Sequence, residues 1–319
     1  TNQTLWNYTT GSYVFSSPAV VNGKVYVGSW DRNVYCLDAL TGACIWNYTT
    51  GDMVGSSPAV VNERLYIGSY DFKVYCLDAA TGAQIWNYTT WDSRISSPAV
   101  VNGRVYVGSG GKVYCLDALT GTRMWDFTTG GIVRSSPAVV DGMVYVGSGD
   151  SKLYALDAVT GLQIWNYTTG DMVGSSPAVV DGRVYVGSND RNVYCLNAST
   201  GERIWNYTTG SWVYSSPAVA YGKVYVGSYD NKVYALDELT GAHIWNFTTE
   251  DIMYGNVSSS PAVADGKVYI GSLDCGVYAL NASTGAKIWK LGTGGQVSSS
   301  PAVADGRVYV GSTYDHKVW

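Results

Sequence analysis

The chain repeats one short unit along its whole length, and this periodicity constrains the fold more than any other feature. All eight prolines lie in the same motif, Ser-Ser-Pro-Ala-Val, and successive prolines are 39 to 44 residues apart. Eight of the twelve tryptophans keep the same period. A period of this length is typical of β-propellers, in which each unit forms one four-stranded blade.

The unit at residues 14–50 contains four short strand patterns. These are VFSSPAVV, KVYVGS, NVYCLDA and ACIWNYTT, separated by the turn signals Asn-Gly, Trp-Asp-Arg and Leu-Thr-Gly. In the second pattern Val25 and Val27 alternate with Tyr26, so both faces of the sheet are apolar. Such a sheet must be covered on both sides, and blades stacked around an axis provide that cover.

The two ends of the sequence match different parts of the unit. Residues 5–11 read LWNYTTG, the outer-strand pattern, and the last residues, YDHKVW, fall within the third strand of the eighth unit. We therefore expect an all-β, eight-bladed propeller of four-stranded antiparallel blades, formed as a single domain by residues 1–319. In this prediction residues 1–10 supply the outer strand of the last blade and close the ring.

Charge and hydropathy argue against a nucleic-acid partner and against a membrane-spanning helix in this chain. The formal net charge is −5 and no cluster of Lys and Arg occurs, so the chain lacks the basic surface that binds nucleic acid. No apolar run reaches the roughly 18 residues that a membrane-spanning helix needs. We expect no nucleic-acid partner and no transmembrane segment in this chain.

The stretch Ala155–Gly161, Ala-Leu-Asp-Ala-Val-Thr-Gly, is followed by Trp165 and Gly170 at a spacing that recurs around the ring. It resembles the tryptophan-docking motif of quinoprotein, or PQQ-like, propellers, and the resemblance covers essentially the whole chain. It implies that a tryptophan on each outer strand packs against the next blade, where an indole buries a large apolar area. The tryptophans at this position are Trp6, Trp46, Trp86, Trp125, Trp165, Trp205, Trp245 and Trp289.

The chain departs from the enzymes that share this motif. PQQ-dependent dehydrogenases are longer, take calcium ligands and a catalytic Asp from insertions, and often carry adjacent cysteines. Here no two cysteines are adjacent, and the longest excursion is four extra residues around Tyr254 to Val257. The chain therefore resembles the non-enzymatic relatives more closely, including the lipoprotein that helps assemble outer-membrane barrels. We predict no enzyme activity and no cofactor, with PQQ and calcium as the alternative.

Other candidate sites are weak. His243 and His316 occupy different repeat positions, so a metal site built on them is not expected. No His and Asp are placed to activate the Ser-Ser-Pro serines. Cys36, Cys76, Cys115 and Cys195 share one repeat position and should be buried free thiols, which leaves Cys36 with Cys44 as the one local disulfide to consider.

Asn-x-Ser/Thr sequons recur at one position of the unit and are compatible with a glycoprotein. The asparagines at this position are Asn7, Asn47, Asn87, Asn166, Asn206 and Asn246. Because duplication copies a motif, they are not independent signals. They indicate an exported protein only if the sites are used.

Differences between the units point to a binding surface. They collect in the segment leading into each innermost strand and in the turn between the second and third strands, two connections that emerge on the same face of an up-and-down blade. Aromatic and Arg side chains are enriched there, as at interface hot spots. The candidate binding residues are Tyr13, Phe15, Trp30, Arg32, Tyr70, Phe72, Arg94, Arg134, Arg191, Trp212, Tyr214, Tyr229 and Tyr254.

The preferred hypothesis is a non-catalytic scaffold, extracytoplasmic or at the cell surface, that binds a protein, glycan or small ligand on this face. One alternative is a PQQ-binding oxidoreductase. The other is a structural module of a larger surface protein, whose exposed turns vary by neutral drift. Catalytic residues and metal ligands are predicted to be absent.

Overall fold

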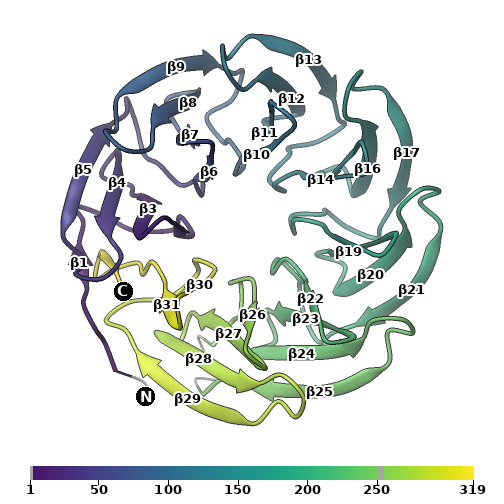
Figure 1. Cartoon of the computed structure of the whole chain (residues 1–319). Coiled ribbons are helices and arrows are strands. Elements are labelled where there is room, and N and C mark those ends of the chain that lie inside the picture. Colours follow the sequence, from purple (N-terminus) through teal and green to yellow (C-terminus); the bar gives the residue numbers. More distant parts are fainter. Residues whose placement is uncertain (1–2, 251–254) are drawn as a thin grey trace.

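The computed structural model describes residues 3–250 and 255–319, which form a ring of small antiparallel sheets around a central axis (Figure 1). Each of seven consecutive units forms one four-stranded blade, with its first strand near the axis and its fourth at the circumference. Blades one to four comprise β2–β5 (Ala19–Val21, Lys24–Gly28, Asn33–Asp38 and Cys44–Thr49), β6–β9 (Ala59–Val61, Arg64–Ser69, Lys73–Asp78 and Gln84–Thr89), β10–β13 (Ala99–Val101, Arg104–Ser109, Lys112–Asp117 and Arg123–Thr128) and β14–β17 (Ala138–Val140, Met143–Gly147, Lys152–Asp157 and Gln163–Thr168). Blades five to seven comprise β18–β21 (Ala178–Val180, Arg183–Gly187, Asn192–Asn197 and Arg203–Thr208), β22–β25 (Ala218–Ala220, Lys223–Ser228, Lys232–Asp237 and His243–Thr248) and β26–β29 (Ala262–Ala264, Lys267–Ser272, Gly276–Asn281 and Lys287–Gly292).

The prediction of eight four-stranded blades is wrong, because the structure has seven. Between blades seven and one lie two two-stranded sheets, which we call the closing segment: β30 (Ala302–Ala304) pairs with β31 (Arg307–Tyr309), and β1 (Tyr8–Thr9) pairs with β32 (Lys317–Val318). An isolated bridge, Gly311 with Val318, and the backbone hydrogen bonds of Val310 with Trp319 join them. The amino-terminal strand β1 does pair with the last strand, β32, but in a two-stranded sheet and not as the outer strand of a four-stranded blade.

The closing segment differs from a blade in the extent of its pairing: residues 310–312 and 317–319 exchange backbone hydrogen bonds, but they do not form one four-stranded sheet with β30 and β1. In blade six, β23 and β24 pair over six residues, from Lys223–Asp237 to Ser228–Lys232. In the closing segment β32 holds two residues, and the turn before it, Thr313 to His316, is one residue longer than the turn of blade six. The eighth unit resembles the others in sequence, but its second and third strands do not form the six-residue ladder that β23 and β24 form in blade six.

The core lies between neighbouring blades. The second and third strands are buried on both faces, as the alternation of Val and Tyr predicted. Tyr185 and Cys195 of blade five pack with Val224 and Leu236 of blade six in one cluster, and all four are fully buried. Equivalent clusters recur around the ring, so each blade is stabilised mainly by its neighbours.

A tyrosine and a tryptophan side chain donate hydrogen bonds from one blade to the next. The Tyr225 hydroxyl and Trp245 Nε1 of blade six both donate to the carbonyl of Ala282 in blade seven, at 3.0 and 3.1 Å. Their ring centroids are 5.8 Å apart. The same pair of hydrogen bonds occurs at seven interfaces, and its tryptophans are Trp6, Trp46, Trp86, Trp125, Trp165, Trp205 and Trp245.

The glycine of each Thr-Gly turn is needed both for its conformation and for the indole against it. Gly241 has φ of 72°, and a Cβ there would lie 2.6 Å from the ring of Trp205. Gly222 has a similar φ of 68°, but a Cβ there would meet nothing within 4 Å. Gly222 is therefore constrained by its backbone conformation alone, whereas Gly241 is constrained both by its conformation and by the Trp205 ring.

We expect Gly222→Ala to cost about 1–2 kcal/mol, the penalty for a side chain in the left-handed region. Gly241→Ala should cost about 1–3 kcal/mol more, because the methyl group also displaces Trp205. Urea denaturation of both variants measures the difference in free energy of unfolding. Equal losses would show that the indole does not press on the turn.

Cys36, Cys44, Cys76, Cys115 and Cys195 form no disulfide in the structure. Cys36, Cys76, Cys115 and Cys195 are buried, as predicted, and Cys44 is exposed. Burial raises the pKa of the Cys195 thiol to about 11, which makes it a poor nucleophile at neutral pH. Cys36 pairs across the ladder with Trp46 and Cys44 with Leu37, and no disulfide joins the two cysteines.

The asparagines of the recurring sequon are exposed on the outer strands, so glycans would be accessible to solvent there. Their glycosylation stays a prediction. Among the described residues, none forms a helix long and apolar enough to cross a membrane.

Candidate functional site on the variable face

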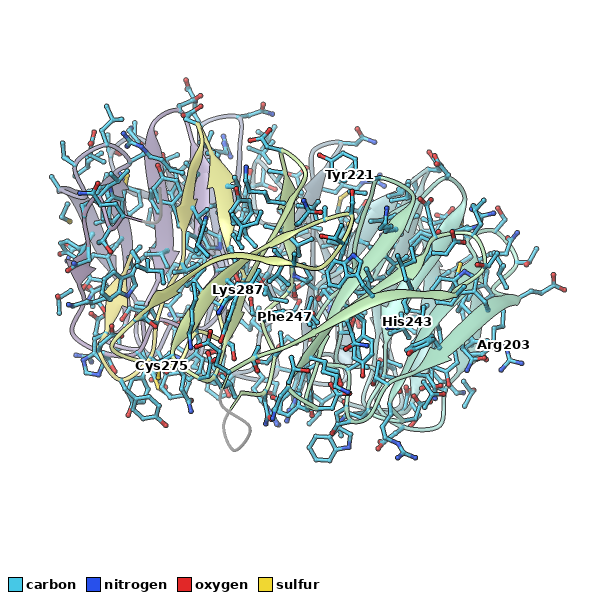
Figure 2. All side chains as sticks on the ribbon, turned by 90° about the horizontal axis from the view of Figure 1, so that it is seen from below. Arg203, Tyr221, His243, Phe247, Cys275 and Lys287 are labelled. Carbon is cyan, nitrogen blue, oxygen red and sulfur yellow. The ribbon has the colours of Figure 1, made fainter. Side chains whose placement is uncertain are left out.

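The two variable regions of each unit lie side by side on one face of the ring, which we call the variable face. A backbone hydrogen bond joins them: Trp30 N donates to Tyr13 O at 2.9 Å, and Tyr229 N to Trp212 O at the same distance. Figure 2 shows the ring edge-on, with Cys275 of a second-to-third-strand turn at this face and Tyr221 of a first-to-second-strand turn at the opposite one. The predicted binding residues that the structure describes are thus brought to one surface.

An aspartate in this turn connects neighbouring units. Asp190 Oδ2 accepts hydrogen bonds from Gly170 N at 2.7 Å and from the Tyr194 hydroxyl at 2.6 Å, and its Oδ1 accepts from Asn192 N at 2.9 Å. Burial alone would raise the pKa of Asp190, but these hydrogen bonds outweigh it and hold the pKa below its ordinary value. The same contacts recur at Asp31, Asp71, Asp150 and Asp230, so these carboxylates fix the base of the variable face.

The lowered pKa of Asp190 predicts that the protein loses stability in acid. Because its pKa is lower in the folded state, the stabilisation is fully present above about pH 4 and is lost as pH falls through the folded value. The variant Asp190→Asn should be less stable than the parent at neutral pH, and the difference should shrink in acid. Urea unfolding of both proteins at neutral pH and at about pH 3 measures it, and a constant difference would contradict the expectation.

Aromatic side chains form a first cluster where blade one meets the closing segment. Tyr13 lies 5.6 Å from Trp30 and 5.3 Å from both Tyr314 and His316, measured between ring centroids. The Phe15 ring lies 4.6 Å from that of Trp30, tilted by 42°, and Trp30 meets Tyr70 of blade two edge-on at 6.4 Å. The first aromatic cluster consists of Tyr13, Phe15, Trp30, Tyr70, Tyr314 and His316.

A second aromatic cluster occupies blade six. The rings of Trp212, Tyr214 and Tyr229 lie 5.3 to 6.3 Å apart. Asn189 Nδ2 of blade five donates to the Tyr214 hydroxyl at 3.0 Å, and burial raises the pKa of Tyr229. Trp212 is nevertheless 49% exposed, so a supported indole is presented to solvent.

The four predicted arginines are distributed around the same face. Arg94 pairs with Asp92 at 3.4 Å, whereas Arg32, Arg134 and Arg191 are exposed and form no ion pair with the described residues. Arg134 borders a shallow cavity of about 280 Å³ together with Ile132 and Met172. The variable face therefore carries positively charged Arg side chains next to apolar ones. Tyr254 lies outside the described residues.

Three of the predicted residues have a backbone role that the sequence did not indicate. Arg32, Phe72 and Arg191 have φ values of 74°, 71° and 74°, in the left-handed region. This conformation turns their carbonyls toward the end of the outer strand of the same blade, where Thr50, Thr90 and Thr209 donate backbone N–H groups to them at 2.8, 2.7 and 2.8 Å. Strained positions of this kind persist where the surrounding structure holds them.

The candidate set omitted three aromatic residues of this face. Tyr314 and His316 join the first cluster only because the closing segment folds against blade one. Trp91 is 82% exposed and stands where other units have glycine, such as Gly51 and Gly130. That departure from the repeat was a signal available in the sequence.

The described residues do not match a calcium-dependent quinone site. Nowhere in residues 3–250 and 255–319 do three His, Cys, Asp or Glu side chains lie close enough together to hold a metal ion. The carboxylates of the variable-face turns are instead occupied by Tyr hydroxyls and backbone N–H groups. No catalytic step is therefore assigned to such a cofactor.

Comparison with known families matches the chain to one described as outer membrane protein assembly factor BamB, under the name PQQ_2, over residues 1–95, 71–174, 168–272 and 232–319. Together these matches cover the whole chain. The chain belongs to this family. As a PQQ_2 chain it carries the family's repeat in every unit, and none of the curated proteins searched matches it.

Solved structures share the fold of this PQQ_2 propeller at low identity. BamB from Moraxella catarrhalis matches with a TM-score of 0.86 and 21% identity, over 99% of this chain and 98% of that one. The computationally designed Ika8 protein matches with 0.86 and 19%, over 98% and 97%. The quinohemoprotein alcohol dehydrogenase ADHIIG from Pseudomonas putida HK5 matches with 0.79 and 20%, over 96% and 71%. At these identities the likeness concerns the fold alone.

Proposed function

We propose that this propeller is a non-catalytic scaffold that binds a protein partner on its variable face. The observation that carries the proposal is the pair of aromatic clusters, each supported from beneath and each open to solvent. Trp, Tyr and Arg are the residues most enriched at interface hot spots, and all three are present on this face. The family, described as an outer membrane protein assembly factor, supports a role in protein interaction.

The chemistry of the face indicates the partner's surface. Arg32, Arg134 and Arg191 are exposed cations without an ion pair among the described residues, so carboxylates on the partner would complement them. Phe15 and Trp212 are exposed apolar side chains that bury area when covered. The partner is therefore a protein that presents acidic groups beside apolar ones.

An extracytoplasmic location goes with this function. The family is described as an outer membrane protein assembly factor, and the exposed sequons would be accessible to modification. We propose that the chain acts outside the cytoplasm on a membrane-associated protein partner. Fractionation of the producing cells, followed by detection of the chain, tests the location separately from binding.

Binding is tested with the purified chain immobilised on a sensor and exposed to detergent-solubilised envelope proteins of the cells that make it. We expect the double variant Trp212→Ala and Tyr214→Ala to lower the captured signal at least tenfold. The matched control is Leu119→Ala and Leu239→Ala, because these leucines are 65% and 58% exposed on the opposite face. An equal loss in both double variants, or in neither, would contradict the proposal.

A quinone-dependent oxidoreductase is the second candidate, because quinohemoprotein alcohol dehydrogenases share the fold. It would require PQQ and calcium to bind near the central axis. Calorimetric titration of the chain with PQQ and Ca²⁺ separates the two proposals. Saturable heat would favour the oxidoreductase, and a flat titration would reject it.

A further inference from the structure

The cavity of about 280 Å³ on the variable face lies between blades four and five, and we call it the inter-blade pocket. It is lined by Gly131, Ile132, Arg134 and Gly149 of the fourth unit and by residues 172–174 of the fifth. Gly149 is exposed, so the pocket is open to solvent at this residue. Three of its lining residues are glycines, so the pocket lies where the backbone carries no side chain.

The repeat contains a second copy of the same arrangement, in which the space is filled. Each lining residue has an equivalent three repeat units, or 119 residues, earlier in the sequence. The backbone is the same at both places: Gly149 N donates to Ile132 O at 2.9 Å, and Trp30 N donates to Tyr13 O at 2.9 Å. The residue equivalent to Gly149 is therefore Trp30, and we call its surroundings the filled copy.

The indole of Trp30 occupies the space at the filled copy. Its ring lies 5.6 Å from that of Tyr13 and 4.6 Å from that of Phe15. Its Nε1 lies 3.4 Å from the position of a Cβ added to Gly55. The equivalents of these three neighbours line the inter-blade pocket, and in the same order they are Ile132, Arg134 and Gly174. The pocket therefore keeps the walls of an indole site but has no indole of its own.

Asn189, which lies next to the pocket, carries a hydrogen-bond acceptor without a partner. Its backbone N donates to Met172 O at 3.0 Å, and its Nδ2 donates to the Tyr214 hydroxyl at 3.0 Å. Asn189 is 6% exposed, and its Oδ1 accepts no hydrogen bond from the described residues. Buried polar atoms are normally hydrogen-bonded, because an unpaired one destabilises the fold. This oxygen is therefore available to a donor that enters the pocket.

The filled copy shows which donor reaches that oxygen. Trp30 Nε1 and Tyr70 Cε2 lie 3.4 and 3.1 Å from one point, the position of a Cβ added to Gly55, so the indole nitrogen lies beside the Tyr70 ring. Tyr70 is the equivalent of Asn189. An indole placed in the inter-blade pocket as Trp30 is placed would therefore direct its N–H toward Asn189 Oδ1.

The remaining walls favour an aromatic ring over an aliphatic side chain. Arg134 stands where the filled copy has Phe15, whose ring is 4.6 Å from that of Trp30. It is exposed and forms no ion pair with the described residues, and a guanidinium is attracted to the face of an indole more than to other rings. Met172 adds a thioether, which makes favourable contacts with aromatic rings. Charge and shape thus select the same side chain.

We propose that the inter-blade pocket binds a tryptophan side chain of the protein partner, which enters at Gly149, donates its Nε1–H to Asn189 Oδ1 and lies against Arg134. This inference rests on the proposed function, since it names the residue that the partner inserts beside the second aromatic cluster. Tyr214 of that cluster is continuous with the pocket, because its ring lies 3.0 Å from the position of a Cβ added to Gly174.

The first test needs no partner protein. N-acetyl-tryptophanamide is titrated into the chain with isotope-labelled methionine methyl groups, and the methyl signals are followed by NMR. We expect a saturable ring-current shift at Met172 and none at Met53, which occupies the equivalent position beside Trp30. N-acetyl-leucinamide, and the tryptophan amide methylated on its indole nitrogen, should each bind at least tenfold more weakly. Equal shifts at the two methionines, or equal binding of the three amides, would overturn the proposal.

Two substitutions of one glycine locate the site. Gly149→Trp supplies the indole from the chain itself, as Trp30 does, and should abolish binding of N-acetyl-tryptophanamide. Gly149→Ala is the matched control, because it brings the same Cβ to 3.2 Å from the Ile132 backbone but leaves the pocket empty. Its affinity should stay within twofold of the parent, and circular dichroism verifies that both variants fold. Unchanged binding by Gly149→Trp would place the site elsewhere.

Capture of envelope proteins separates this inference from the proposed function. Gly149→Trp should lower the captured signal at least tenfold, and Gly149→Ala should leave it unchanged. If the double variant Trp212→Ala and Tyr214→Ala lowers capture but Gly149→Trp does not, the variable face binds a protein without this pocket and only the inference fails. If neither lowers capture, both the inference and the proposed function fail.

Discussion

Raising the pH above about 10 is expected to unfold the protein in one cooperative step rather than by gradual ionisation of its tyrosines. Tyr66, Tyr145 and Tyr225 lie on second strands and are at most 2% exposed. Burial, the largest cause, raises the pKa of each to about 12. Burial likewise raises the pKa of Tyr154 and Tyr278, on third strands, to about 12.

The sign of this effect follows from the two states. The folded state holds these phenols neutral, so the stabilisation is complete below the unfolded pKa of about 10 and falls as pH rises toward the folded value. Each tyrosine that ionises only in the unfolded chain lowers the free energy of unfolding by about 1.4 kcal/mol per pH unit. Several together approach the 5–15 kcal/mol, roughly, that holds a domain folded.

The measurement is circular dichroism and tyrosinate absorbance on one sample as pH rises. We expect both signals to change together between about pH 10 and 12. Tyrosinate absorbance that reaches its full value while the β-sheet signal persists would contradict the account.

Replacing one interface tryptophan is expected to have the largest effect of any single substitution. Trp205→Ala removes a 93%-buried indole, given its 7% exposure, together with its packing on Tyr185 at 5.9 Å and its hydrogen bond to Glu238 O at 3.1 Å. It also leaves space above Gly241. A loss of about 3–5 kcal/mol is expected for such a cavity.

The matched control is Trp289→Ala, at the same repeat position. Trp289 borders a cavity beside the closing segment and has no carbonyl partner among the described residues, so its removal should cost less than half as much. Urea denaturation of both variants, with equal slopes, gives the comparison. Equal costs would show that the carbonyl and the glycine contribute little to the interface.

Local structure could be predicted from the sequence wherever a single repeat unit contains all the residues that determine it. The four strands and their turns were predicted, and the Asp of the Thr-Gly turn does cap it: Asp38 Oδ1 accepts from Thr41 N at 2.8 Å. The eighth blade was not correctly predicted, because a motif match counts residue types and not paired backbone groups. β32 pairs with β1 over two residues, and β30 pairs with β31 in a separate two-stranded sheet.

The candidate site was predicted in outline only. Variation between units identified one face, because both variable connections of an up-and-down blade emerge together. Ring closure was expected to bring the two ends together, but the contacts of Tyr13 with Tyr314 and His316 depend on side-chain packing that the repeat pattern does not specify. The roles of the Arg32 and Arg191 carbonyls were also hidden, because a left-handed φ at a non-glycine residue depends on the hydrogen bonds around it.

Site-specific photo-crosslinking tests the central claim, that the variable face binds a protein, most directly. A photoreactive residue is placed at Trp212, at Arg191, or at Leu239 on the opposite face, and the chain is irradiated with the envelope proteins of the cells that make it. We predict one protein adduct of the same mass from positions 212 and 191, and none from position 239. Adducts of equal yield from all three positions, or an adduct from position 239 alone, would contradict the claim.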